Sequence, residues 1–122
     1  MTTYGPYTPV RSAGNLLFVS GQVGIDPATK IAPVDIEGQT KQVLKNIAAA
    51  LENTGASIQD VVKTTIFVTN VDDFSKVNSV YELFFDAPRP ARSTIEVAGL
   101  PKVAGDTKLL VEIEALAYKE VK

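Results

Sequence analysis

The chain has 122 residues, 45% of them hydrophobic, and its 12 basic and 14 acidic side chains give a net charge of -2. A chain of this length can bury roughly two-thirds of its unfolded surface, so we expect one domain over residues 1–122. It has no histidine and no cysteine. Their lack excludes Ser-His-Asp and Cys-His catalysis and any metal site ligated by His or Cys, and leaves acid–base chemistry to carboxylates, Lys or Tyr.

The distribution of charge and of apolar residues bears on partners and location. No basic block occurs, which disfavours a surface for nucleic-acid phosphates. Residues 1–6 lack the pattern of a signal peptide, and the longest apolar run, Ile47 to Leu51, is too short to span a bilayer. The lack of cysteine fits a reducing compartment. We therefore expect a cytoplasmic protein with no nucleic-acid and no membrane partner.

The first predicted element is a β-hairpin. Its strands, Val10 to Ala13 and Leu16 to Ser20, flank Gly14-Asn15, a pair that readily takes the positive φ angles of a tight turn. The glycines and prolines of residues 21–33 then predict an irregular loop.

A helix is predicted next, starting after the capping residue Asp35 and stopping before Gly55. Its apolar residues recur at helical spacing: Ile36, Val43, Leu44, Ile47, Ala48 and Leu51. The β-branched segment Val61 to Thr69 predicts a strand, with Val62, Ile66 and Val68 on one face.

A second helix is predicted after Asp72 or Asp73 and before Pro88, and two strands follow it. The apolar stripe of this helix consists of Phe74, Val77, Tyr81, Phe84 and Phe85. The last strands are Arg92 to Val97 and Leu109 to Tyr118.

The predicted order β-β-α-β-α-β-β contains two strand-helix-strand units, which favour parallel crossovers with both helices on one face of the sheet. Hairpins at the two ends of the chain add antiparallel pairing. The fold class is therefore α+β with a mixed sheet. A chain this short has no third layer for the other sheet face, so we expect self-association through that face and site residues near subunit boundaries.

Arg92 lies in a strand-like stretch and is the first candidate for binding a ligand. A guanidinium stays charged and presents a planar fork of donors, which suits a carboxylate or phosphate on a small anionic substrate. Arg92, Thr94 and Glu96 share one strand face. The ordinary alternative is a cross-strand ion pair of Arg92 with Glu112 or Glu96.

Two carboxylates, Glu112 and Glu114, point to the same side of the last strand. They are either solvated residues on the wet side of the sheet, or one of them is a base or holds a water. The strand pattern does not choose between them.

Three further positions are candidates for contact with a ligand. Asn78 falls on the apolar side of the second helix, where its amide needs partners or a ligand. Ser20 and Gly21 end the second strand and could offer a hydroxyl and an unobstructed backbone N–H. Each of these residues also has an ordinary role, as a helix-end bond, a cap or a turn.

Taken together, several short motifs resemble the Rid (YjgF-like) family in order and spacing along the whole chain. They are Gly5-Pro6-Tyr7, Phe18-Val19-Ser20-Gly21-Gln22, Val62-Lys63-Thr64-Thr65, Val77-Asn78, Pro90-Ala91-Arg92-Ser93 and Glu112-Ile113-Glu114-Ala115. The resemblance implies a chorismate-mutase-like fold and a homotrimer with ligand clefts at its interfaces.

The resemblance also implies an activity. Members with the matching arginine are 2-iminobutanoate/2-iminopropanoate deaminases, which hydrolyse enamines and imines to 2-oxoacids and ammonia without a metal or organic cofactor. By similarity, Arg92 binds the substrate carboxylate and Glu112 holds the attacking water. Tyr7, Ser20, Gly21, Asn78 and Thr94 match other cleft residues, with Tyr7 contributed across the interface.

The sequence departs from the family pattern in two places. Thr94 stands where many deaminating members carry cysteine, and the segment between Phe85 and Arg92 is short. Two other functions compete with the deaminase. One is a non-catalytic metabolite-binding or chaperone-like trimer, which Arg92 with Glu112 disfavours. The other is an endoribonuclease or translation inhibitor, which the net charge of -2 disfavours.

Overall fold

The computed structural model describes residues 3–120. Five strands, two α-helices and two short 3-10 helices alternate along this part of the chain. In chain order they are β1 (Val10–Ala13), β2 (Leu16–Val23), α1 (Ile36–Glu52), η1 (Ile58–Asp60), β3 (Val61–Val68), η2 (Val71–Asp73), α2 (Phe74–Tyr81), β4 (Ala91–Glu96) and β5 (Val111–Tyr118).

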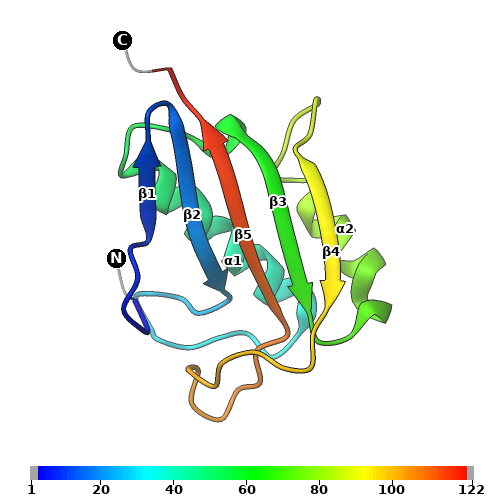
Figure 1. Ribbon diagram of the computed structural model, residues 1–122. Coiled ribbons are helices and arrows are strands. Elements are labelled where there is room, and N and C mark those ends of the chain that lie inside the picture. Colours follow the sequence, from blue (N-terminus) through cyan, green and yellow to red (C-terminus); the bar gives the residue numbers. More distant parts are fainter. Residues whose placement is uncertain (1–2, 121–122) are drawn as a thin grey trace.

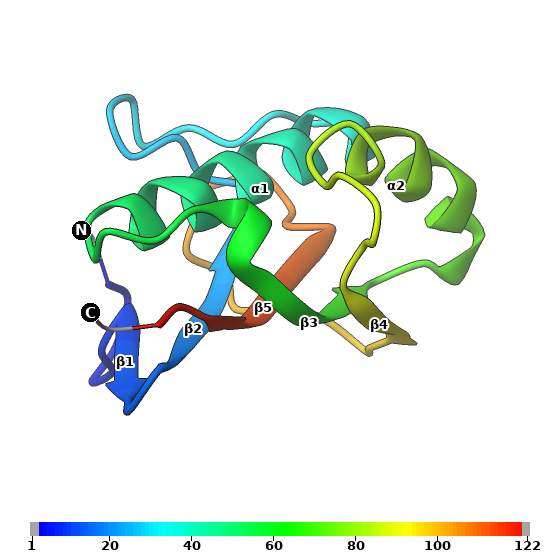
Figure 2. The same cartoon turned by 90° about the horizontal axis from the view of Figure 1, so that it is seen from above.

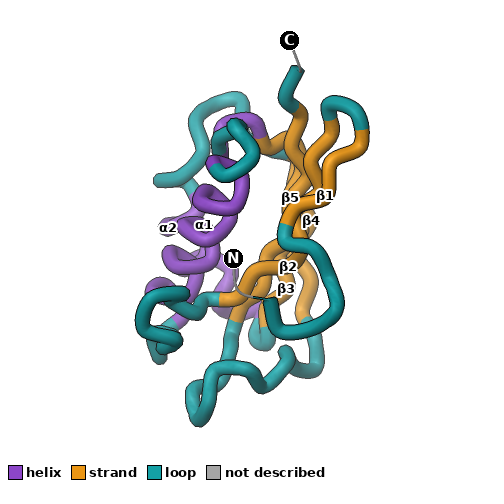
Figure 3. Tube along the Cα trace, turned by 90° about the vertical axis from the view of Figure 1, so that its left-hand side faces the viewer, coloured by secondary structure: helices purple, strands orange, loops and turns teal. Residues whose placement is uncertain are grey.

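The fold has two layers, a twisted sheet and a pair of helices. The strands form one five-stranded sheet in the order β1-β2-β5-β3-β4. Both α-helices lie on one face of this sheet, as Figures 1 and 2 show. In the side view of Figure 3 the helices stand on one side of the strands, and no helix or strand of residues 3–120 covers the other side. The predicted α+β class, with both helices on one face of a mixed sheet, is confirmed.

Local sequence signals located the hairpin turn and the start of the first helix. The predicted end of the second strand at Ser20 and Gly21 is wrong, because β2 continues to Val23. The hairpin turn falls at Gly14, whose φ is 59°, so β1 and β2 pair from Val10↔Val19 to Ala13↔Leu16. Helix α1 begins as predicted, because the Asp35 side chain accepts a hydrogen bond from the Gly38 N–H. Strands β3 and β4 are parallel, as a crossover through α2 requires.

The predicted hairpin between the last two strands is wrong. Strand β5 does not pair with β4. It lies between β2 and β3 and is antiparallel to both. The 14-residue connection 97–110 is long enough to carry the chain back across the sheet, and the apolar alternation of β5 suits a central strand that one layer of helices covers. Because β2 and β3 both run against β5, they are parallel to each other.

Two smaller expectations also need correction. Val62 was predicted to share a face with Ile66, but it is 48% exposed, because a bulge between Val61 and Lys63 shifts the register and buries Val61 instead. Helix α2 is also shorter than predicted. It ends at Tyr81, and Asp73 precedes it without a side-chain capping bond.

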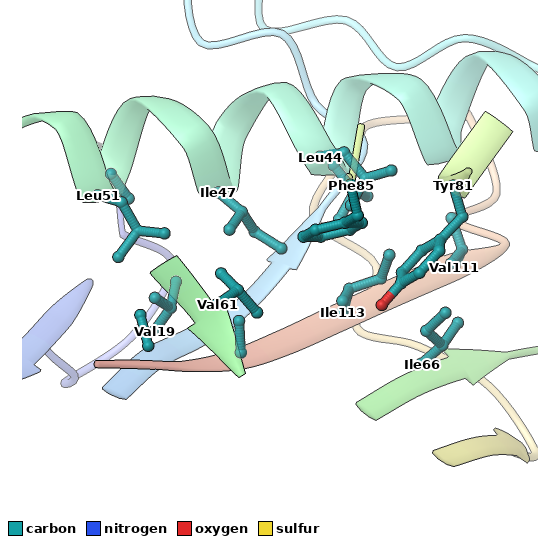
Figure 4. Close-up of a cluster of buried hydrophobic side chains, with 14 of the residues drawn as sticks. Val19, Leu44, Ile47, Leu51, Val61, Ile66, Tyr81, Phe85, Val111 and Ile113 are labelled. Atoms are coloured by element: carbon teal, nitrogen blue, oxygen red, sulfur yellow. The ribbon is translucent and has the colours of Figure 1, made fainter. Parts of the chain in front are cut away.

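The main core lies between α1, α2 and the covered sheet face. Leu44, Ile47 and Leu51 of α1 belong to one buried cluster with Ile66 and Ile113 of the sheet, and all five are fully buried (Figure 4). Each such side chain contributes about 1.5–3 kcal/mol through its removal from water. The core therefore fixes how α1 sits on the sheet.

The opposite sheet face is open and partly apolar. Phe18 and Tyr118 on this face are 45% and 44% exposed, and Ile95 of the edge strand is 45% exposed. Register places all three on the same side as Glu112, because Phe18 pairs with Leu116 and Ile95 pairs with Phe67, the partner of Glu112. Among residues 3–120, no helix is long and apolar enough to cross a membrane.

Candidate functional site

The sheet edge at β4 carries the first group of candidate residues. Arg92 pairs in register with Thr64 of β3, a buried residue of the helix-covered face, so its side chain is directed toward α2. The guanidinium carbon lies 5.1 Å from the centre of the Phe74 ring and 5.0 Å from the centre of the Tyr81 ring. Both distances are within the range of a cation–π contact. Arg92 is therefore held against α2 by aromatic faces.

The charge of Arg92 has no anionic partner among residues 3–120. Glu96, one of the two predicted ion-pair partners, accepts a hydrogen bond from the Val71 N–H at 2.8 Å. Glu112, the other predicted partner, is on the opposite face of the sheet with β3 between the two strands. The ordinary ion-pair alternative is thus excluded within one copy of this part of the chain, and the donors of Arg92 are free for a ligand.

Asn78 and Thr94 lie close to Arg92 in the fold. Asn78 is one helical turn from both Phe74 and Tyr81, on the stretch of α2 between the two rings. Its Oδ1 atom is buried and has no hydrogen-bond partner among the described residues. Thr94 follows Arg92 on the same face of β4 and pairs with Ile66. A buried acceptor without a partner costs free energy, so it indicates a ligand or a water at this position.

The second group of candidates lines a cavity of about 350 Å³ that contains Glu112. Its residues are Tyr4, Tyr7, Ser20, Gly21, Gln22, Val23, Ile25, Pro27, Asn46, Ala49, Pro101, Val103 and Glu112. We call this the Glu112 cavity. Most of its wall is apolar, with a small set of polar groups, as is usual for pockets that bind small molecules.

The environment of Glu112 changes its acid–base behaviour. Burial raises the pKa of this carboxyl above its ordinary value of 4.5, and the nearby Glu114 carboxylate raises the pKa further. The ionised form of Glu112 is therefore a stronger base than an exposed glutamate. This asymmetry distinguishes Glu112, which is half-buried, from Glu114, which is exposed and is not in the cavity wall.

A bulge in β2 brings Ser20 and Gly21 to Glu112. The register steps from Val19↔Ala115 to Gln22↔Ile113, so β2 has one extra residue at this point. The Ser20 hydroxyl donates a hydrogen bond to the Thr8 carbonyl at 2.6 Å, which ties the segment before β1 to the bulge. Tyr7 lies in that segment, and so the bulge also places its ring in the wall of the cavity.

Gly21 leaves room for the Glu112 carboxylate. A Cβ atom at this position would lie 2.5 Å from Glu112 Oε2, which is closer than real side chains approach. At Gly24, in contrast, a Cβ would meet the backbone of Gln39 on α1 at 2.9 Å. The two glycines thus serve different purposes, one at the carboxylate and one at helix packing.

We expect Gly21→Ala to displace the Glu112 side chain and to lower kcat by about tenfold, because small misplacements of a reacting group are costly. Thermal stability should change little, since the carboxylate can move. Gly24→Ala is the matched control, and it should lower Tm, because helix backbone cannot yield. Steady-state kinetics and thermal melts of both variants test this. A normal kcat for Gly21→Ala would contradict the close packing.

The two groups do not meet within one copy of the chain. Arg92, Thr94 and Asn78 lie between β4 and α2, whereas Glu112 shares its cavity with Tyr7, Ser20 and Gly21. Glu112 pairs in register with Phe67 and points to the open face. The predicted site residues therefore form two half-sites, which we name the Arg92 half-site and the Glu112 half-site.

Several residues around these half-sites were not predicted as functional. The apolar periodicity assigns Phe74 and Tyr81 to the core stripe of α2, although both rings also contact Arg92. The apolar cavity wall includes Ile25 and Val103 from loops, which have no periodic signal. Among the described residues, no three acidic side chains are grouped so that they could hold a metal ion.

Comparisons with known proteins agree with the sequence motifs. Residues 1–119 match the family described as Endoribonuclease L-PSP. The chain is 44% identical over 118 residues to the 2-iminobutanoate/2-iminopropanoate deaminase of Escherichia coli K12, which covers 94% of this chain and 88% of that protein. It is 49% identical over 117 residues to a RutC family protein of Pyrococcus horikoshii, with 95% and 89% covered.

Solved structures show the same fold. The YjgF gene product of E. coli superposes with a TM-score of 0.88 at 40% identity, over 97% of this chain and 91% of that chain. E. coli TdcF with bound serine gives a TM-score of 0.88 at 37% identity, with the same coverage of 97% and 91%. The matched length, the identity and the shared architecture agree, and the chain therefore belongs to the Rid (YjgF, L-PSP) family.

Proposed function

We propose that this protein hydrolyses 2-imino acids and their enamine forms, such as 2-iminopropanoate and 2-iminobutanoate, to 2-oxoacids and ammonia. The observation that carries the proposal is the guanidinium of Arg92, which is half-buried against two aromatic rings and has no anionic partner among residues 3–120. Such a group suits the carboxylate that every 2-imino acid carries. The E. coli relative that is 44% identical bears the name of this activity.

The proposed mechanism divides the work between the two half-sites. Arg92 binds the substrate carboxylate and fixes the position of the imine carbon. Glu112 accepts a proton from a water molecule, whose oxygen then adds to the imine carbon. The imine is protonated on nitrogen when the water adds, so a neutral carbinolamine forms. Its nitrogen then takes the proton held by Glu112, its hydroxyl gives a proton to water as the C=O bond forms, and the C–N bond breaks to release ammonia. The reaction changes no oxidation state, so it needs no redox cofactor.

Assembly into a trimer is part of the proposal. Arg92 and Glu112 lie on opposite sides of one sheet, so one copy of the chain cannot direct both at the same small substrate. The partly apolar open face, with Phe18, Ile95 and Tyr118, supplies a surface through which copies can associate. We propose that the Arg92 half-site of one subunit meets the Glu112 half-site of its neighbour.

A mixing experiment tests this arrangement. Arg92→Ala and Glu112→Gln subunits should each be nearly inactive alone. When the two variants are unfolded together in equal amounts and refolded, about a quarter of the interface sites will receive an intact Arg92 and an intact Glu112 from different subunits. We expect about a quarter of the wild-type activity in the mixture, measured as 2-oxobutanoate release in a threonine dehydratase reaction.

The control is the same mixture made without refolding, in which subunits stay in their original assemblies. Recovered activity only after refolding supports sites shared between subunits. If each variant is inactive and the refolded mixture is inactive as well, while wild-type protein regains activity by the same treatment, then Arg92 and Glu112 act within one subunit and the shared site is wrong.

The description of the matched family raises ribonuclease activity as a second candidate. The surface chemistry of this chain does not favour it. The net charge is -2, and the chain has no histidine for acid–base work on a phosphodiester. The basic side chains also form no block along the sequence. Imine hydrolysis therefore remains the function that the half-sites support best.

A further inference from the structure

Two aromatic rings lie against the Arg92 guanidinium. Its central carbon lies over the rings of both Phe74 and Tyr81, at 5.1 Å and 5.0 Å from their centres. These residues are seven positions apart on α2, two helical turns on one side of the helix. The guanidinium is thus bracketed along the helix axis by two aromatic faces.

Tyr81 is held firmly in place. Its side chain is only 4% exposed, and its hydroxyl is hydrogen-bonded to the Thr64 hydroxyl at 2.7 Å. Its ring centre also lies 4.6 Å from that of Phe85, at a tilt of 39°. Thr64 is the register partner of Arg92 across β3 and β4. The strand pair that carries Arg92 therefore also fixes the ring beneath it.

Phe74 differs, because it contributes little to the core. Phe74 is the first residue of α2 and is 44% exposed, whereas Val77, one turn later, is buried and only 1% exposed. An aromatic side chain left this open has little apolar packing to explain its position, and within residues 3–120 its one contact with another ring or with a cation is the contact with Arg92. The position of Phe74 thus points to a role in covering the guanidinium.

We infer that Phe74 and Tyr81 are positioning residues, and we call the pair the aromatic clamp. It holds the flat guanidinium by its faces, so that the N–H donors at its edge stay directed at the substrate carboxylate. This inference rests on the proposed function. A long arginine side chain without a salt bridge would otherwise lose rotamer freedom when a ligand binds, and the clamp removes part of that loss beforehand.

The test uses Phe74, because replacing the buried Tyr81 would also disturb folding. Phe74→Leu keeps an apolar side chain but removes the ring face, while Phe74→Tyr keeps the ring. We expect Phe74→Leu to raise KM for 2-iminobutanoate and Kd for 2-oxobutanoate by about fivefold, as the loss of one partly exposed cation–π contact implies. The kcat value should stay within about twofold, since carboxylate binding is common to ground and transition states. Phe74→Tyr should behave as wild type.

Two controls separate positioning from a structural role. Leu83→Ala removes another exposed apolar side chain, 79% exposed, that is outside both half-sites, and it should leave KM unchanged. In an Arg92→Met background, Phe74→Leu should change Kd by less than about twofold, because no cation is left for the ring to hold. An equal effect of Phe74→Leu in both backgrounds would overturn the inference.

A measurement without ligand tests the aromatic clamp independently of the proposed function. Ring currents from two aromatic faces should shift the side-chain protons of Arg92 upfield in the NMR spectrum, and Phe74→Leu should reduce that shift. If wild-type protein neither hydrolyses imines nor binds 2-oxobutanoate, the proposed function fails, and the NMR shift still decides on the clamp. Normal activity with unchanged KM, Kd and shift in Phe74→Leu would reject the clamp alone.

Discussion

Arg92→Ala is expected to lower kcat/KM for 2-iminobutanoate by about a hundredfold or more, which is the usual effect of truncating one partner of a desolvated charge pair. The substrate carboxylate would lose its charged donors, and the imine carbon would no longer be held near the water. The rate of 2-oxobutanoate release in a threonine dehydratase reaction, with and without the purified protein, measures the effect. Arg92→Lys should retain part of the activity, because it keeps the charge without the fork.

The fold should tolerate the loss of Arg92. Among residues 3–120 the guanidinium has no ion-pair partner, so its removal leaves no buried carboxylate uncompensated. The Tm and the oligomeric mass of Arg92→Ala should therefore be close to those of wild type. Near-normal activity in a well-folded Arg92→Ala protein would exclude the arginine as the carboxylate site.

Glu112→Gln is expected to lower kcat by about a hundredfold or more, the usual contribution of a positioned general base. A carboxamide can hold a water molecule but accepts its proton poorly, so KM should change little. In the wild type, kcat/KM should fall in acid as Glu112 becomes protonated, at a pH above the ordinary carboxyl value of 4.5 because burial and Glu114 raise its pKa. The pH profile of Glu112→Gln should lack this fall. A wild-type profile in the variant would remove Glu112 from this role.

The same substitution should stabilise the protein near neutral pH. The folded state raises the pKa of Glu112, so folding favours its protonated form, and this contribution to stability is lost as the pH rises through the raised pKa. Above that pH the ionised, partly buried carboxylate destabilises the folded state, and the neutral side chain of glutamine does not. Thermal melts should give Glu112→Gln the higher Tm near neutral pH, and the difference should shrink as the pH falls below the ordinary carboxyl pKa of 4.5, where Glu112 becomes protonated in the folded and the unfolded chain alike. Gain of stability with loss of activity is the pattern of a functional charge.

The sequence was informative where a local signal determines the structure. Gly14 at the turn and Asp35 at the helix start both have one physical role, and both were located to the residue. The position of β5 was not predictable in this way. Pairing with β4 and insertion between β2 and β3 use the same apolar alternation, and only the packing of the whole sheet distinguishes them.

The candidate site was also predictable only in the part that a local pattern determines. Strand alternation placed Glu112 and Glu114 on the same side of the last strand, and for that reason it could not choose between them. The bulge at Ser20 and Gly21 is what encloses Glu112, and no residue spacing reveals a bulge. The rings over Arg92 were also hidden, since an aromatic in an apolar stripe has the same pattern whether or not a cation lies on it.

The insertion of β5 has a consequence for how the molecule folds. During synthesis β1–β2 and β3–β4 emerge before β5, as two separate pairs of strands, and the register pair Leu16↔Tyr118 joins residues that are far apart in the sequence. Contacts of such long range slow folding, because a large loop must close before they form. Glu112 belongs to β5, the strand whose pairing closes this loop. A chain that stops before β5 thus has neither a continuous sheet nor the Glu112 carboxylate, because this one strand provides both.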